Sequence, residues 1–432
     1  MSNYVGKPVQ RYEGIGHVTG KTVYVDDIKL PGMLYAKVLH SPVHKGVIRS
    51  IDTTEAENMP GVEAVITAKD IPGENSVAAP DEPVFVEKHI RFKGERIAAV
   101  AAIDEDTAID AVRKIKVDIE EQEPVFDPVE AMKPNAPKVR PEGNLWQFNS
   151  GDCRVLRKGD VEKGFTEADE IVEERIIHKM NDHATIEPSA SVATIDGNDR
   201  LVIYTVSQLF HVHLSQLLKI FDLPISKVCM VGGTVGGGFG GKNLINCDHV
   251  AGLLALKIRR PVKYRMSRKE DMLYTFKRGA YIFDYKCGVK KDGKFVACKV
   301  NAIHDIGAYQ THGEYAIEKP MLYITGPYCC PNVWFDGYAV FTNKQQTGSM
   351  RGFNLVNVTH ASEIMMNRMA EAINMDPWEI RFINAWRDGD TNPTMWEVKA
   401  AGLIEAMQKA AELGEIALPQ HLKEMSSKGR EV

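Results

Sequence analysis

Residues 232–243 constrain the fold of this 432-residue chain more than any other segment, because seven of these twelve positions are glycine. Their sequence is Gly-Gly-Thr-Val-Gly-Gly-Gly-Phe-Gly-Gly-Lys-Asn. Glycine permits positive φ and removes the Cβ that would keep a ligand away from the main chain. An apolar segment typical of a strand, 227–231, precedes the run, and a segment typical of a helix, 244–258, follows it. This order predicts a loop whose unpaired backbone N–H groups bind an anion, usually a phosphate.

Two nucleotide-binding motifs overlap the run, and neighbouring residues weigh against both. Residues 236–243 fit a P-loop except at Asn243, where a P-loop has a Ser or Thr hydroxyl for magnesium. The spacing also fits a dinucleotide-binding motif, but the next strand, 262–266, leads into Ser-Arg-Lys at 267–269, a basic segment, and not into an acidic residue. So dense a run indicates instead a backbone that lies against a large flat ligand. A glycine turn that only packs against the protein is the alternative.

The bulk properties exclude several classes of protein. A net charge of −5 argues against a dedicated nucleic-acid surface. There is no N-terminal apolar stretch of the kind found in signal peptides, and no apolar run near the ~18 residues that span a bilayer. The seven cysteines are odd in number and form no Cys-x-x-Cys pair. We therefore expect a cytoplasmic chain without disulfides or an iron–sulfur cluster of its own, which binds neither nucleic acid nor membrane.

The pattern of apolar residues predicts an α+β protein with two folded regions. In the first region, strands are expected at 35–40, 63–67, 97–102 and 116–119, with a helix over 104–115 that Asp104 or Asp106 caps. In the second, strands are expected at 201–206, 281–286 and 295–302, with helices at 207–221, 244–258 and 359–373. The expected boundaries are a first domain at 1–125, a proline-rich linker at 126–160, a second domain at 161–390 and a helical extension at 391–432.

Two further segments carry chemically informative side chains. In 349–354, Ser-Met-Arg-Gly-Phe-Asn, an arginine able to clamp an anion lies beside an aromatic ring able to stack on a planar substrate. In 183–188, His-Ala-Thr-Ile-Glu-Pro, and at Gln208, polar side chains lie near the ends of expected strands. Taken alone, each segment is most often an ordinary turn or a hydrogen-bonded core residue, so their order along the chain is the more informative feature.

In that order, the segments resemble those of the molybdenum hydroxylases, the xanthine dehydrogenase and aldehyde oxidase family. There, a His-x-x-x-Glu-Pro-like segment precedes a strand ending in Gln, a Gly-Gly-Gly-Phe-Gly-Gly-Lys loop and an Arg-Gly-Phe segment. The resemblance covers nearly the whole chain, since 24–27, 67–72 and 93–98 match the family's hammerhead domain and 374–384 matches a segment beyond Arg-Gly-Phe. It implies a small N-terminal α/β hammerhead domain followed by a larger α+β molybdopterin-binding domain.

The resemblance also implies roles for individual residues. Gln208 contacts the apical oxo group of molybdenum and lies near the metal without necessarily ligating it. The residues implied to lie against the cofactor are His183, Gly237, Gly238, Phe239, Gly240, Arg351 and Gly352. The ring of Phe353 stacks on the substrate. Asn243 and Lys319 stand where purine-oxidising members carry Glu and Arg, so a small aromatic acid suits the site better than a purine; a surface lysine is the alternative for Lys319.

One family feature is not found in the sequence. The Gly-Val-Gly-Glu segment that carries the general-base glutamate does not occur. The resemblance therefore implies that a medium molybdopterin subunit completes the active site, as in the nicotinate dehydrogenases of anaerobic bacteria. The expected cofactor is molybdenum–molybdopterin cytosine dinucleotide, with FAD and [2Fe–2S] clusters on further partner subunits.

The expected function is that of the large molybdopterin subunit of a molybdenum hydroxylase. The expected reaction is the hydroxylation of nicotinate, a small N-heteroaromatic acid, to 6-hydroxynicotinate. Water is the oxygen source, and electrons pass through [2Fe–2S] and FAD to NADP. A purine, an aldehyde or an aromatic thioester is the alternative substrate. A P-loop-like nucleotide phosphohydrolase and a non-catalytic assembly module are the more remote alternatives.

Overall fold

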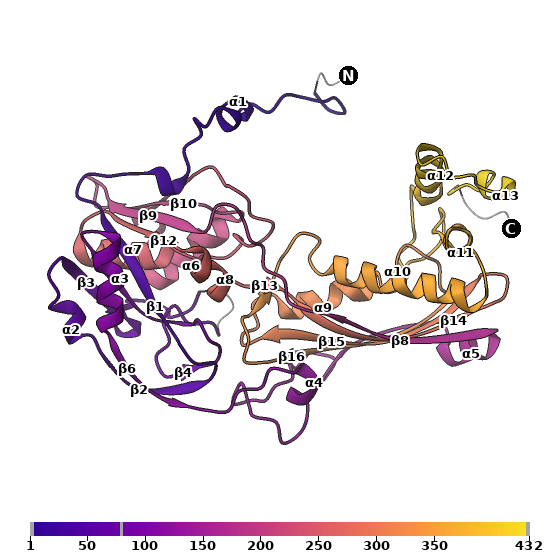
Figure 1. The fold of residues 1–432 in the computed structure, drawn as a ribbon, viewed down its shortest axis with the longest axis horizontal. Coiled ribbons are helices and arrows are strands. Elements are labelled where there is room, and N and C mark those ends of the chain that lie inside the picture. The colour runs from indigo at the N-terminus through magenta and orange to yellow at the C-terminus, as the bar shows by residue number, and fades with distance from the viewer. Residues whose placement is uncertain (1–3, 78–80, 429–432) are drawn as a thin grey trace. The chain divides into compact units, whose positions relative to one another are not determined.

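The structure is a computed structural model that describes residues 4–77 and 81–428. The chain divides into two compact units: unit 1 falls within residues 1–122 and 183–275, and unit 2 within 123–182 and 276–432. Each unit has its own sheets (Figure 1). Within the described residues, no helix is both long and apolar enough to cross a bilayer.

A seven-stranded sheet forms the centre of unit 1, in the order β11-β10-β9-β12-β1-β5-β3. Its strands are β1 (Leu34–His40), β3 (Val62–Thr67), β5 (Arg96–Ala102), β9 (Ala190–Ile195), β10 (Leu201–Thr205), β11 (Val228–Gly232) and β12 (Val262–Arg265). Every residue of β5, which lies between β1 and β3, is buried, as its continuous apolar run predicts. β1 pairs in parallel with β12, so strands from both segments of unit 1 share one sheet.

Among its described residues, unit 1 also has a three-stranded sheet and six helices. β2 (Gly46–Asp52) lies between β4 (His89–Ile90) and β6 (Lys116–Glu121). The helices are α1 (Gly14–Val18), α2 (Thr54–Glu57), α3 (Glu105–Lys114), α6 (Phe210–Phe221), α7 (Asp248–Ile258) and α8 (Arg268–Tyr274), with 3-10 turns at Val25–Asp27, Ala68–Asp70 and Ile225–Lys227. Asp104 caps α3 by accepting a hydrogen bond from the N–H of Thr107. α7 is buried over most of its length against β9 and β12.

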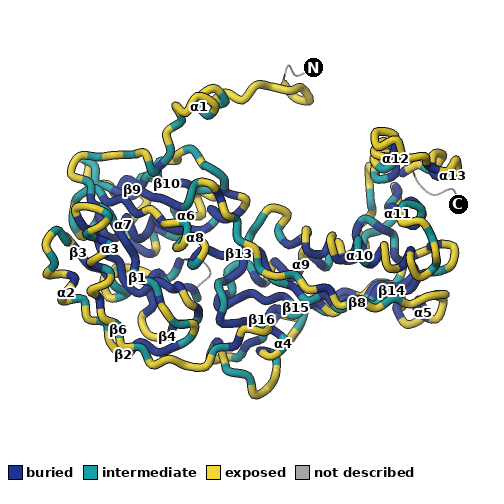
Figure 2. Tube along the Cα trace, in the orientation of Figure 1, coloured by how far each residue is buried: buried dark blue, intermediate teal, exposed yellow. Residues whose placement is uncertain are grey.

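A five-stranded sheet forms the centre of unit 2, in the order β7-β16-β15-β14-β8. Its strands are β7 (Arg154–Lys158), β8 (Glu170–His178), β14 (Ala280–Val289), β15 (Phe295–Gly307) and β16 (Asn332–Phe341). β13 (Lys277–Arg278) and β17 (Thr347–Gly348) pair in parallel as a separate two-stranded sheet. In both units, the buried positions concentrate in the strands (Figure 2).

Helices cover both faces of the sheet of unit 2. They are α4 (Pro128–Ala131), α5 (Val161–Glu167), α9 (Gly313–Leu322), α10 (Leu355–Ala372) and α11 (Pro377–Asn384). Alternation along β15 sends Cys298 to the core shared with α9 and α10, whereas Ala297 packs against α5 on the opposite face. α12 (Leu403–Leu413) and α13 (Gln420–Lys423) form a smaller core with α11.

The structure confirms the α+β class and most of the expected elements, although several of their bounds differ. The helix expected at 244–258 begins at Asp248, because residues before it form turns. The helix expected at 359–373 is α10, which begins earlier, at Leu355. The segment 126–160, expected as a linker, contains α4 and β7, and Val139 and Phe148 within it are buried in the core of unit 2.

Candidate functional site

The glycine loop and Gln208 lie at the same edge of the unit 1 sheet. β10 and β11 are parallel neighbours, so their carboxyl ends point to one edge. The loop leaves the end of β11, and Gln208 follows β10 by three residues. This common edge explains how positions 30 residues apart in sequence meet in the fold.

The side chain of Gln208 is fixed by the loop. Its Oε1 accepts hydrogen bonds from the N–H of Gly240 at 2.9 Å and from the N–H of Lys242 at 3.2 Å. Because both partners are donors, the atom facing them has to be the oxygen, and the NH₂ group is the other end of the amide. Gln208 is exposed, and no acceptor for this NH₂ lies among the described residues. The chain thus presents a fixed hydrogen-bond donor at the sheet edge.

Several glycines of the loop are required by the protein's own side chains. A Cβ at Gly238 would lie 2.5 Å from Cδ and Oε1 of Gln208. A Cβ at Gly236 would lie 2.5 Å from Cβ of Glu187, and one at Gly241 would lie 2.9 Å from Cγ of His183. The close approach that the sequence led us to expect for a ligand is therefore made in part by Gln208, Glu187 and His183.

Fewer loop N–H groups are available than the sequence led us to expect. Six of them donate within the protein: Gly233 to Thr205 O, Gly236 to Glu187 Oε2, Gly240 and Lys242 to Gln208 Oε1, Gly241 to Gly238 O and Asn243 to Gly240 O. Among the described residues, no acceptor lies near the N–H groups of 237–239. The loop thus satisfies many of its own N–H groups, and among the described residues those of 237–239 stay available to a ligand.

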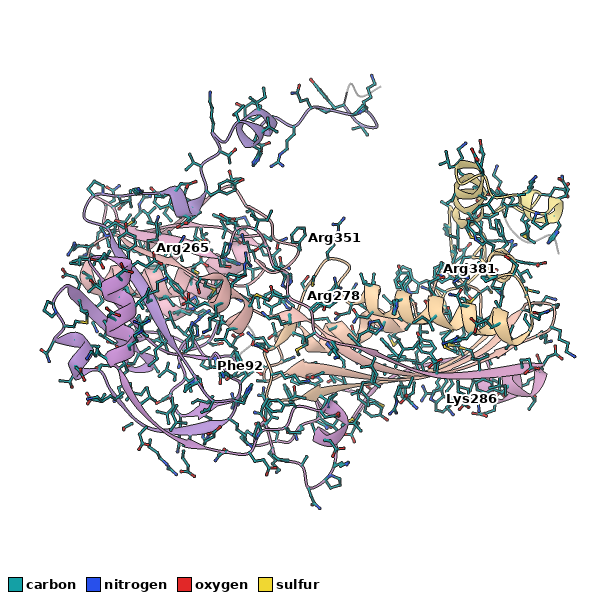
Figure 3. The ribbon with its side chains drawn as sticks, in the orientation of Figure 1. Phe92, Arg265, Arg278, Lys286, Arg351 and Arg381 are labelled. Carbon is teal, nitrogen blue, oxygen red and sulfur yellow. The ribbon has the colours of Figure 1, made fainter. Side chains whose placement is uncertain are left out.

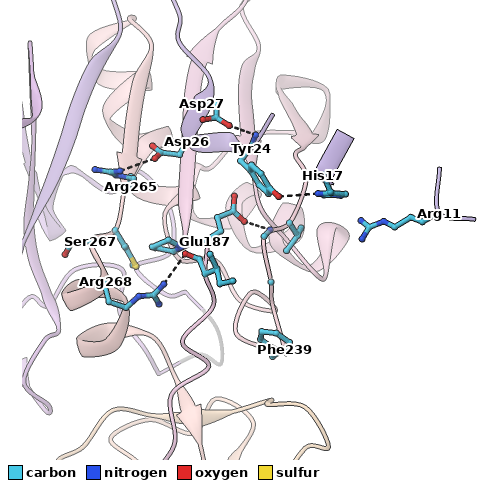
Figure 4. A pocket seen from close by; sticks show the side chains of 16 residues that line it. Arg11, His17, Tyr24, Asp26, Asp27, Glu187, Phe239, Arg265, Ser267 and Arg268 are labelled. Atoms are coloured by element: carbon cyan, nitrogen blue, oxygen red, sulfur yellow. Dashed lines mark hydrogen bonds and ion pairs between the residues drawn. The ribbon is translucent and has the colours of Figure 1, made fainter. Parts of the chain in front are cut away.

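Phe239, in the middle of these three residues, has a strained backbone. Its φ is 53°, in the left-handed region that bulky residues rarely occupy, and its side chain is 46% exposed. It lines a pocket of about 820 Å³ together with Tyr24, Glu187 and Arg268 (Figure 4). Strain of this kind persists only where the surroundings impose it, and it concentrates at functional sites.

A buried polar network contacts the loop at the carbonyl of Gly241. Nδ2 of Asn246 donates to the carbonyl of Gly241 at 3.2 Å, and Nη2 of Arg96 donates to the carbonyl of Asn246 at 3.0 Å. Arg96 also contacts Nε2 of His249. Burial, with the charge of Arg96, holds the pKa of His249 well below its usual value, so the neutral ring accepts from the guanidinium. Sequence reasoning missed this network because Arg96 lies 150 residues from Asn246 in the chain.

In unit 2, Arg351, Gly352 and Phe353 form a turn before α10. Three successive residues, Gly352, Phe353 and Asn354, have φ of 87°, 37° and 66°. Nη2 of Arg278 donates to the carbonyl of Arg351 at 2.7 Å, and both arginines are labelled in Figure 3. Burial lowers the pKa of Arg278. Arg351 itself is exposed.

The ring of Phe353 has an aromatic neighbour that the sequence did not indicate. The ring of His312 meets it edge-on, at a centroid distance of 6.2 Å and an interplanar angle of 89°. Burial lowers the pKa of His312, which favours the neutral ring. Lys319 is exposed on α9, seven residues beyond His312 and therefore about 10 Å farther along the helix axis. Asn243 is half-buried beside the glycine loop.

The sequence-predicted residues thus form two groups. Unit 1 brings together the residues on or against the glycine loop: His183, Gln208, Gly237, Gly238, Phe239, Gly240 and Asn243. Unit 2 holds Arg351, Gly352 and Phe353 in one turn, and Lys319 on α9. The first group offers N–H and NH₂ donors beside a glycine-rich surface, which suits a flat ligand that carries oxygen acceptors.

Two protein-family models and a solved structure match this chain. Residues 147–385 match the family model of the molybdopterin cofactor-binding domain, and residues 19–123 match that of the aldehyde oxidase and xanthine dehydrogenase a/b hammerhead domain. The solved structure of aldehyde oxidoreductase from Desulfovibrio gigas superposes with a TM-score of 0.90 at 29% identity, covering 96% of this chain and 47% of that one.

Two curated relatives are similar over nearly the whole chain. A Bacillus subtilis protein, described as a probable subunit of a xanthine dehydrogenase, is 36% identical over 413 residues, covering 94% of this chain and 55% of that protein. The nicotinate dehydrogenase large molybdopterin subunit of Eubacterium barkeri is 33% identical over 411 residues, covering 94% of this chain and 96% of that protein. The chain therefore spans about half the length of the first relative and almost all of the second.

Proposed function

We propose that this chain, which belongs to the aldehyde oxidase and xanthine dehydrogenase family of molybdopterin oxidoreductases, forms the Gln208 side of the active site of a molybdenum hydroxylase. The observation that carries the proposal is the amide of Gln208, whose oxygen is held by two loop N–H groups while its NH₂ group is exposed. A fixed donor of this kind suits an oxygen carried by the cofactor.

The molybdopterin cofactor fits the residues present. When bound, it supplies the two-electron oxidation that accompanies transfer of a water oxygen to the substrate. In our proposal, Gln208 donates its NH₂ hydrogen bond to an oxygen of this group, and the N–H groups of 237–239 face its pterin. His183, Gly240, Arg351 and Gly352 complete the residues against the cofactor. Gln208 would thus lie near the metal without necessarily being one of its ligands.

Phe353 and its neighbours position the substrate in this proposal. Stacking on the ring of Phe353 holds a planar substrate in one orientation, which is an effect on positioning and not on chemistry. The perpendicular ring of His312 packs beside that ring. Lys319 attracts the carboxylate of an aromatic acid, and the amide of Asn243 bonds a polar group of the substrate.

We propose nicotinate as the substrate and 6-hydroxynicotinate as the product. The support is the Eubacterium barkeri protein, which matches this chain over almost its whole length. A purine is the second candidate, because the Bacillus subtilis relative of higher identity is described as part of a xanthine dehydrogenase. Asn243, which replaces the Glu of purine-oxidising members, favours nicotinate.

We further propose that partner subunits complete the enzyme. A medium molybdopterin subunit would supply the general-base glutamate, and other subunits would carry FAD and [2Fe–2S] clusters and pass electrons to NADP. The cofactor would be the cytosine dinucleotide form. The names of both relatives, each described as a subunit, support an assembly of several chains.

An isotope experiment tests this proposal. The complex, purified through a tag on this chain, is incubated in H₂¹⁸O with nicotinate and, separately, with xanthine. We expect 6-hydroxynicotinate that carries one ¹⁸O atom and much slower turnover of xanthine. Faster oxidation of xanthine would favour the second candidate, and oxidation of neither substrate would contradict both.

The geometry does not favour a P-loop hydrolase. A P-loop lysine reaches the phosphates of the nucleotide. Here Lys242 is buried, and its ammonium is paired with Glu187 at 2.8 Å. A lysine held in this way is not available to a phosphate.

A further inference from the structure

A buried ion pair ties the two ends of the glycine loop together. Oε2 of Glu187 accepts hydrogen bonds from the N–H of Gly236 at 2.6 Å and from Nζ of Lys242 at 2.8 Å. The side chains of Glu187 and Lys242 are 10% and 2% exposed. One carboxylate oxygen thus holds both the first and the last residue of the segment 236–242, and Figure 4 shows the bond from Glu187 to the loop.

Lys242 connects this ion pair to Gln208. Its N–H donates to Oε1 of Gln208 at 3.2 Å, and its carbonyl accepts from the N–H of Gln208 at 2.9 Å. The position of the Gln208 amide therefore depends on where Lys242 lies. Lys242 is in turn fixed through its ammonium by Glu187.

The glycine loop needs such an ion pair because its glycine-rich backbone has high conformational freedom. Glycine loses more conformational freedom on ordering than any other residue. The loop also contains three residues with positive φ, Gly237, Phe239 and Gly240. Hydrogen bonds to charged groups are stronger than neutral ones, and the two buried charges compensate each other. The pair can therefore order the loop without leaving an uncompensated charge beneath it.

We infer that Glu187 is a positioning residue that acts through Lys242 to hold the amide of Gln208 in place before any ligand binds. The inference rests on the proposed function of Gln208. Its consequence is that the ion pair matters for turnover only as long as Gln208 is present.

The test uses the purified complex and a variant in which the charges of Glu187 and Lys242 are removed together. The single variant Glu187→Gln leaves the buried Lys242 ammonium unpaired, which endangers folding. The double variant Glu187→Gln/Lys242→Met removes both charges and keeps a side-chain oxygen for the N–H of Gly236. Asp199→Asn is the matched control, because it removes an exposed carboxylate paired with Lys227 and Arg259 in the same unit.

The kinetic measurement is a coupling experiment. For the double variant we expect kcat per bound molybdenum to fall about tenfold or more, as for a displaced catalytic group, with KM changed by less than about threefold. Adding the same two changes to Gln208→Ala should lower kcat by no more than about twofold further. If the fold-decreases in kcat of the double variant and of Gln208→Ala multiply when the changes are combined, Glu187 acts independently of Gln208 and the inference is overturned.

Hydrogen exchange of the loop separates this inference from the proposed function. In the double variant, but not in Asp199→Asn, peptides covering 236–243 should exchange about 10- to 100-fold faster, the factor expected from losing a hydrogen bond to a charged group. Unchanged exchange would overturn the inference whatever the activity. Faster exchange together with normal turnover in both the double variant and Gln208→Ala would support the tie and refute the role of Gln208.

Discussion

Replacing Gly238 by alanine should displace the Gln208 amide with little other change to the protein. The added Cβ would lie 2.5 Å from both Cδ and Oε1 of Gln208, whereas carbon atoms in contact are about 3.5–4.0 Å apart. The amide therefore has to move by about 1 Å. Gly238 is not among the residues with positive φ, so alanine is compatible with its backbone. The substitution is thus a steric test and not a conformational one.

The size of the effect follows from the bonds that this movement weakens. Oε1 of Gln208 accepts from Gly240 and Lys242, and each of these hydrogen bonds contributes about 0.5–1.5 kcal/mol net. Losing both costs about 1–3 kcal/mol of stability. A displacement of about 1 Å in a group that acts on the reaction lowers the rate by up to about 100-fold. We therefore expect a folded complex with strongly reduced turnover.

The assay is kcat per bound molybdenum in the purified complex, measured together with its melting temperature. Gly197→Ala is the control, because a Cβ there meets nothing within 4 Å and φ at Gly197 is not positive. The control should behave like the wild type in both measurements. If the kcat of the Gly238→Ala complex stays within about twofold of the wild type, the position of the Gln208 amide does not matter for turnover.

Three further perturbations test other parts of the molecule. Phe353→Ala should lower kcat/KM for nicotinate about tenfold or more through loss of stacking, with the molybdenum content unchanged; an unaltered kcat/KM would remove its positioning role. Lys319→Gln should raise KM about tenfold for nicotinate but not for nicotinamide, and equal effects on both would exclude contact with the carboxylate. Burial raises the pKa of Glu82 to about 7, so the folded state binds the extra proton and stability falls as the pH rises from about 4.5 to 7. Glu82→Gln should abolish up to about 3 kcal/mol of this loss, seen as a smaller drop in melting temperature between pH 5 and 7.5, and an unchanged drop would contradict it.

Local features of the fold could be predicted from the sequence. The glycine run lies between a strand and a helix as expected, and Asp104 caps α3. These features depend on residues close together in the chain, where apolar periodicity and capping side chains act directly. The parallel pairing of β1 with β12 joins segments more than 200 residues apart, and no local pattern indicates it.

Much of the candidate site depends on such distant contacts. Glu187 reaches the loop from 49 residues away, and its role was not visible in the sequence. The sequence indicated that the glycines are sites of close approach. It did not indicate that the side chains of Gln208 and Glu187 make part of that approach. His312, the neighbour of Phe353, was missed because a single histidine carries no distinctive pattern.

The most direct test of the account is the cofactor content of the native complex. The complex is purified through a tag on this chain from the cells that make it, molybdenum is measured by mass spectrometry, and the nucleotide is released by acid hydrolysis. We expect about one molybdenum atom and one cytidine monophosphate for each copy of this chain. A complex that contains its partner subunits but neither molybdenum nor a pterin would contradict it.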